Sequence, residues 1–81
     1  MLSEKEFENL SIKFNDNFDH SPISGRRSEL LYEDIKNYDY KSFKMSLDSI
    51  LFSFNKWDGF SMTDIANLTR KYSIENAKGL E

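Results

Sequence analysis

Residues 40–54 have the sequence YKSFKMSLDSILFSF, in which apolar side chains recur every three or four positions. On a 3.6-residue helical wheel, six of them fall within about 100° of one another: Tyr40, Phe43, Leu47, Ile50, Leu51 and Phe54. Asp39, which directly precedes this run, is a residue type that caps helix N-termini. This strongest periodic signal in the chain predicts a helix that buries one face in a core.

An earlier helix is predicted over residues 3–16. Ser3 and Glu6 have the spacing of a capping box, in which the hydroxyl and the carboxylate each accept a hydrogen bond from a backbone amide. Leu2 and Phe7 lie where a hydrophobic staple would place them. The apolar positions of this segment keep helical spacing: Phe7, Leu10 and Phe14.

The segment 15–25 is rich in turn-forming residues, and we expect a loop pinned by Phe18 and Ile23. A second helix is predicted from about 24 to 37, with a stripe formed by Leu31, Ile35 and Tyr38.

A fourth helix is predicted to begin at Ser61, because Asp64 follows at capping-box spacing and Phe60 precedes it as a staple residue. Its apolar face is expected to end near Ser73 and consists of Met62, Ile65, Leu68, Thr69 and Tyr72. Residues 74–81 are predicted to form a flexible tail, whose terminal Leu80-Glu81 is typical of a cloning remnant.

The 81 residues are therefore predicted to form one all-α domain over 1–73, a compact bundle of four short helices. With seven Phe, four Tyr and one Trp, its core should be rich in aromatic rings. The absence of cysteine excludes disulfides and cysteine-based zinc sites and favours a reducing, cytoplasmic location. The net charge of −3 disfavours a module that neutralises phosphates, and no apolar stretch is long enough for a membrane span.

The sequence carries little catalytic apparatus, so we expect no enzymatic activity and no cofactor. His20 is the one histidine and lies in a predicted loop, while the three glycines lie too far apart for a phosphate-binding loop. Two pairs of glutamates lie one helical turn apart: Glu4 with Glu8, and Glu29 with Glu33. Such pairs could bind a hard cation, but solvated helix faces have the same pattern and are the favoured interpretation.

Candidate partner-binding residues lie off the main stripes. Met45 and Phe52 occupy nearly the opposite side of residues 40–54, which indicates either a helix packed from both sides, the favoured alternative, or an exposed docking patch. Trp57 and Phe60, in the predicted interhelical loop, either cover the core or anchor an interface. Lysines that would rim such an interface are Lys41 and Lys44.

Two alternatives come from other classes. Residues 62–68 are typical of the first helix of a helix-turn-helix, with residues 73–78 as a short recognition helix, but Arg70 stands where the turn glycine is expected. The acidic first helix, with Glu4, Glu6 and Glu8, also suits a small inhibitory or immunity-type protein that blocks a basic toxin or nucleic-acid-processing enzyme.

Across roughly residues 7 to 68, the spacing of apolar and acidic positions resembles that of phage replicative-helicase loader and inhibitor proteins. The positions that carry the resemblance are Tyr32, Ile35, Asp39-Tyr40, Leu47, Ile50, Trp57, Phe60 and Thr63-Asp64-Ile65. The family's loop carries prolines where this chain has Asp58 and Gly59. The resemblance implies a helical, non-enzymatic adaptor that contacts a replicative helicase and a replication initiator. Direct binding of nucleic acid is not expected, because the net charge of the chain is negative.

Overall fold

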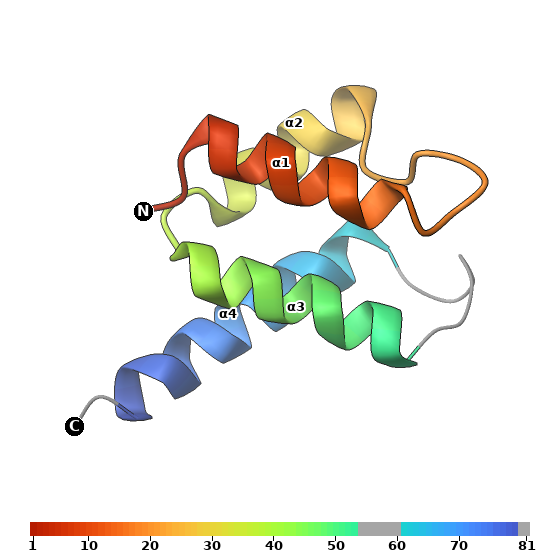
Figure 1. Cartoon of the computed structure of the whole chain (residues 1–81). Helices are drawn as coiled ribbons and strands as arrows, with labels where there is room; N and C mark the ends of the chain where they lie inside the picture. The colour runs from red at the N-terminus through yellow and green to blue at the C-terminus, as the bar shows by residue number, and fades with distance from the viewer. Residues whose placement is uncertain (54–60, 80–81) are drawn as a thin grey trace.

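The computed structural model describes residues 1–53 and 61–79, which form four helices and, within these ranges, no strand (Figure 1). The helices are α1 (Glu4–Asn15), α2 (Gly25–Ile35), α3 (Tyr40–Ser53) and α4 (Met62–Gly79). The predicted all-α bundle of four short helices is confirmed.

The helices form two stacked pairs, with α1 and α2 above α3 and α4 in the view of Figure 1. The most extensive contact joins α3 to α4, while α1 packs on α3 and α2 packs on α4. Because α1 and α2 pack mainly on the lower pair, the surface between them stays open.

The core is aliphatic and aromatic, and Phe7 connects three of its helices. The Phe7 ring stacks on Phe43 with centroids 5.4 Å apart and tilts against Tyr32 at 5.1 Å, so that one side chain joins α1, α2 and α3. Such ring pairs add to the free energy of apolar burial. The buried apolar residues are Leu2, Phe7, Leu10, Phe14, Ile23, Leu31, Ile35, Phe43, Leu47, Ile50 and Ile65.

Both predicted capping boxes form. At α1, the Glu6 amide donates to the Ser3 hydroxyl at 3.1 Å and the Ser3 amide donates to the Glu6 carboxylate at 3.0 Å. At α4, the corresponding distances are 3.3 Å from the Asp64 amide to Ser61 and 2.9 Å from the Ser61 amide to Asp64. These side chains satisfy amides that a helix start leaves without partners.

Asp39 caps α3, as its position predicts. Its carboxylate accepts hydrogen bonds from the Ser42 amide at 3.0 Å and from the Ser42 hydroxyl at 2.7 Å. Partial burial raises the pKa of Asp39, but the hydrogen bonds from Ser42, its own amide and Ser73 outweigh that effect and hold the pKa below its usual 3.8.

The connection from α1 to α2 is held by Asn15. Its side-chain amide donates to the Ile23 carbonyl, and its side-chain oxygen accepts from the Ile23 amide, both at 3.0 Å. Ile23 is buried and Phe18 is half-buried against Phe14, which confirms both predicted pins of the loop. Gly25 follows in a left-handed conformation with φ of 56°.

Two details of the prediction are wrong. Helix α4 does not end near Ser73 but continues to Gly79, so residues 74–79 are helical and not a flexible tail. The cause is a tertiary contact: the Asn76 side chain donates to the Ser42 hydroxyl of α3 at 3.1 Å, which holds this part of α4 against α3. Tyr40, assigned to the buried stripe, is 39% exposed because it lies in the first turn of α3, at the edge of the core.

Candidate protein-binding surfaces

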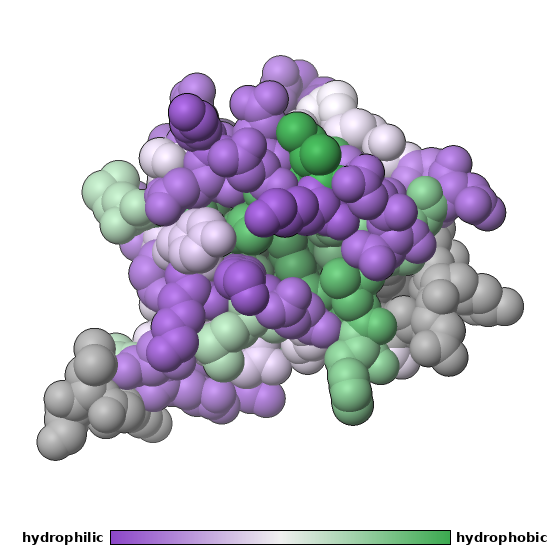
Figure 2. Space-filling view, in the orientation of Figure 1, coloured by the Kyte–Doolittle hydropathy of each residue, from purple (hydrophilic) through white to green (hydrophobic). Residues whose placement is uncertain are grey.

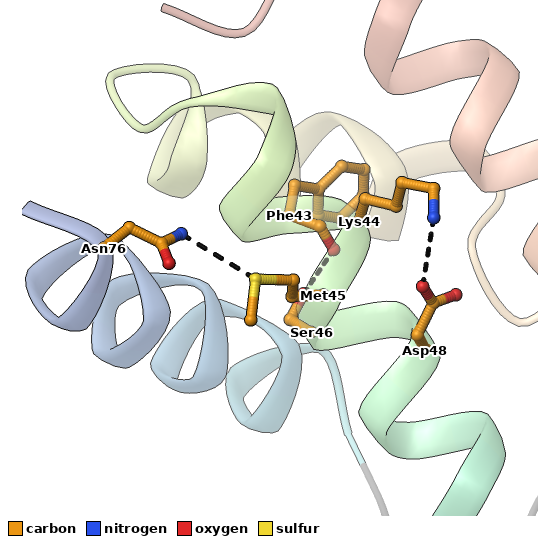
Figure 3. Close-up of polar contacts among 6 residues, drawn as sticks. All are labelled: Phe43, Lys44, Met45, Ser46, Asp48 and Asn76. Atoms are coloured by element: carbon orange, nitrogen blue, oxygen red, sulfur yellow. Dashed lines mark hydrogen bonds and ion pairs between the residues drawn. The ribbon is translucent and has the colours of Figure 1, made fainter. Parts of the chain in front are cut away.

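The predicted partner-binding residues that the structure describes all lie on α3, but they do not form one surface. Met45 is half-buried, and the Asn76 side-chain amide lies 3.8 Å from its sulfur, so Met45 belongs to the contact between α3 and α4 (Figure 3). The expectation of a helix packed from both sides therefore holds for Met45. Phe52 differs, since its side chain is 90% exposed.

Phe52 lies in the last turn of α3, one residue before the helix ends at Ser53. An exposed phenylalanine leaves a large apolar area in water, and folding of the chain gains little from it. The favoured alternative, a helix packed from both sides, is therefore wrong for Phe52, and the exposed docking residue stays a prediction. Trp57 and Phe60, the other two aromatic candidates, lie outside the described residues.

The two lysines of the predicted rim are exposed and lie in the first half of α3. The Lys44 ammonium makes an ion pair with the Asp48 carboxylate at 3.3 Å, one turn along the same helix (Figure 3). Lys41 makes no ion pair with the residues described. An exposed pair of this kind contributes little to stability, so Lys44 can exchange Asp48 for a carboxylate on a partner.

A small hollow borders α3 between Lys44 and Leu51. It has a volume of about 180 Å³ and lies in the seam between α1 and α3, where Leu10, Leu47 and Leu51 line it beside Lys44. Figure 2 shows hydrophobic residues gathered along this seam, bordered by hydrophilic ones, and more of them toward the C-terminal end of α3.

A larger groove, of about 700 Å³, runs between α1 and α2 and was not predicted from the sequence. The apolar part of its lining includes Ile12 from α1, Leu30 from α2 and Ile23 from the loop. Ile12 and Leu30 are 51% and 54% exposed. Both lie off the stripes that enter the core, and this was the signal in the sequence that could have indicated a second apolar surface.

Charged residues surround the same groove. Glu4 and Glu8 of α1 and Glu29 and Glu33 of α2 all line it, so the two glutamate pairs noted in the sequence meet at one feature. Arg26 is the one basic residue of the lining. Four glutamates and one arginine give the groove a formal charge of −3, equal to the net charge of the whole chain.

Part of this charge is already compensated. The Lys36 ammonium donates to the Glu33 carboxylate at 2.9 Å, and this hydrogen bond together with the attraction of Glu33 raises the pKa of Lys36. Glu4, Glu8 and Glu29 make no ion pair with any described residue. Glu6, which the acidic-inhibitor hypothesis also used, accepts the Ser3 amide in the capping box and does not line the groove.

One polar group of the groove is unsatisfied. Ser11 lines it and is only 5% exposed, yet its hydroxyl has no hydrogen-bond partner among the residues that the structure describes. The oxygen atom itself exposes less than 1 Å² to solvent, so this buried hydroxyl carries an uncompensated desolvation cost.

Among the described residues, the structure supports neither a metal site nor a helix-turn-helix. Within residues 1–53 and 61–79, no three histidine, cysteine or carboxylate groups lie close enough to hold a metal ion. The helix-turn-helix hypothesis is wrong in its geometry, because residues 62–79 form one continuous helix and Arg70 lies inside it, where a turn was required. None of the described helices has both the length and the apolar content that crossing a membrane requires.

Comparison with known proteins gives no relative. No family model matches the chain, and neither a curated protein nor a solved structure matches it.

Proposed function

We propose that this chain is a non-enzymatic adaptor that acts by binding another protein through the C-terminal end of α3. The observation that carries the proposal is the 90% exposure of Phe52 on a regular helix whose other phenylalanine, Phe43, is completely buried. Aromatic side chains are enriched in the centres of protein interfaces and scarce on surfaces that bind nothing.

The energetics favour Phe52 as an anchor. Burying a fully exposed phenylalanine in a partner's pocket stabilises a complex by about 1.5–3 kcal/mol, which corresponds to roughly a tenfold to hundredfold gain in affinity. The helix already fixes the backbone at Phe52, so binding has to restrict only the side-chain torsions of the ring. A second apolar feature of the same helix is the hollow beside Leu47 and Leu51, where Lys44 supplies a positive charge.

The resemblance to phage helicase loader and inhibitor proteins supports a replicative helicase or a replication initiator as the partner. In this proposal the chain occupies a surface of the helicase or initiator and alters its assembly. Catalysis by the chain is not required, because occupancy alone changes which contacts the partner can make.

A binding experiment with a matched control tests the proposal. A purified bacterial replicative helicase and an initiator are each titrated with the chain, with Phe52→Ser and with Ile74→Ser, which removes another exposed apolar side chain, on α4. Phe52→Ser is expected to weaken binding at least tenfold and Ile74→Ser to leave it unchanged. Absence of binding by the folded wild-type chain contradicts the helicase and initiator assignment, and equal loss in both variants contradicts the role of Phe52.

A further inference from the structure

We propose that the groove between α1 and α2 is a separate binding site, which holds a basic amphipathic helix of a partner protein. It does not involve Phe52, and none of the residues that line it comes from α3 or α4. The proposal therefore goes beyond the adaptor surface described above and can fail or succeed independently of it.

The apolar lining provides the first argument. Ile12 and Leu30 each leave about half of their surface exposed, and they lie on the two helices that border the groove. Its volume of about 700 Å³ is within the range of sites that enclose several side chains. Two helices that border an apolar groove are a common receptor for the apolar face of a third.

Charge complementarity provides the second argument and defines the occupant. Glu4 and Glu8 lie one turn apart on α1, Glu29 lies on α2, and all three lack ion-pair partners among the described residues. A helix with aliphatic residues on one face and lysines or arginines along both borders of that face would place each cation opposite a carboxylate. Such pairs contribute to specificity and to the rate of association.

The length of the groove provides the third argument. The groove extends along α1 from Glu4 to Asn15, which at 1.5 Å per residue corresponds to about 16 Å or three turns of a bound helix.

A synthetic peptide provides the test. The probe is an amphipathic helix of Leu, Ala and Lys, about four turns long, with lysines on both sides of a leucine stripe. One control has the same composition in scrambled order, and a second replaces every lysine with glutamate. Binding is followed through the methyl resonances of Ile12, Leu30 and Ile50 in the full chain. The lysine-rich peptide should shift the methyl resonances of Ile12 and Leu30 and leave those of the buried Ile50 unchanged. Its Kd should be below about 1 mM and should rise with salt concentration.

Charge reversal provides the matched variants. Glu8→Lys with Glu29→Lys should weaken binding of the basic peptide about tenfold or more and create binding of the acidic control peptide. Asp34→Lys with Glu75→Lys makes the same change in net charge at exposed residues outside the groove and should leave the affinity within about twofold.

Four outcomes would overturn the proposal: no saturable binding up to about 1 mM, equal binding of the scrambled peptide, shifts that map to Phe52, or equal loss in both charge-reversed variants. Self-association of the chain that buries Ile12 and Leu30 would assign the groove to a second copy and would also overturn it. None of these outcomes bears on the Phe52 titration with helicase and initiator.

Discussion

The hydroxyl of Ser46 in α3 lies 2.9 Å from the hydroxyl of Thr69 in α4, and neither side chain is accessible to solvent. Each hydroxyl also lies close to a carbonyl of its own helix. The Ser46 hydroxyl is 2.7 Å from the Phe43 carbonyl (Figure 3), and the Thr69 hydroxyl is 2.8 Å from the Ile65 carbonyl. Three hydrogen bonds are within reach, but two hydroxyls carry only two hydrogens, so one of the three is always unmade.

Ser46→Ala and Thr69→Val are expected to be mild changes. When one hydroxyl is removed, the other still donates to its own carbonyl, so each variant should lower the free energy of unfolding by about 1 kcal/mol or less. The double variant should lose no more unfolding free energy than the two single variants lose together. Denaturant unfolding of the wild type, both single variants and the double variant provides the measurement. A loss above about 2 kcal/mol in either single variant would show that the contact between helices dominates.

Ser11→Ala is expected to stabilise the protein by about 1 kcal/mol, because it removes an unsatisfied buried hydroxyl and introduces a better helix former. Ser49→Ala, at a half-buried position inside α3, is the control for helix propensity alone. Thermal unfolding of the two variants separates the contributions. A Ser11→Ala protein less stable than wild type would show that the hydroxyl has a partner, such as bound water.

Asp39 should make stability depend on pH in the acidic range. Folding lowers the pKa of Asp39 below 3.8, so its carboxylate form stabilises the fold above that pH, and the contribution is lost as the pH falls through the lowered pKa. Asp39→Asn keeps a residue type that caps helices but cannot titrate. The difference between the unfolding free energies of wild type and Asp39→Asn should be constant above about pH 5 and shrink below pH 4.

A difference that does not change with pH would contradict this role of Asp39. Asp39→Ala provides the calibration at neutral pH, where loss of the cap should cost about 1 kcal/mol. Wild type and variants share the same other carboxylates, so the comparison isolates the one that accepts hydrogen bonds from Ser42.

Asn76→Ala is expected to loosen the C-terminal turns of α4. The substitution removes the hydrogen bond to the Ser42 hydroxyl and the contact with the Met45 sulfur, which join these turns to α3. Amide hydrogen exchange should become faster in residues 73–79 and remain unchanged in α1. Asn67→Ala, at an exposed position of α4, is the matched control. Equal acceleration in both variants would indicate that the end of α4 frays whether or not it contacts α3.

Local sequence signals predicted most of the fold. Helix starts were identifiable because Ser3 with Glu6, Asp39, and Ser61 with Asp64 form their caps within a few residues of sequence. The end of α4 was not identifiable from the sequence. The hydrogen bond from Asn76 to Ser42 joins residues far apart in the chain, so no periodic pattern marks it. Tyr40 shows the complementary error, since a helical wheel gives the direction of a side chain but not where the core ends.

The candidate surfaces were less predictable. Met45 and Phe52 both depart from the apolar stripe of their helix, and the sequence did not show that only Phe52 would be exposed. The groove between α1 and α2 was missed, because Ile12 and Leu30 become one surface only when two helices distant in sequence come together. The same applies to Glu8 and Glu29, which in the sequence alone are indistinguishable from solvated helix faces.

Gly25, at the start of α2, has a left-handed conformation, so the chirality of a residue placed there matters more than the space that its β-carbon needs. A methyl group at this position would meet no atom within 4 Å, so steric room is present. An L-alanine would nevertheless be strained by about 1–2 kcal/mol at a positive φ. A D-alanine introduced by chemical synthesis prefers a positive φ and restricts the conformations of the unfolded chain. D-alanine at position 25 should therefore stabilise the protein, whereas L-alanine should destabilise it.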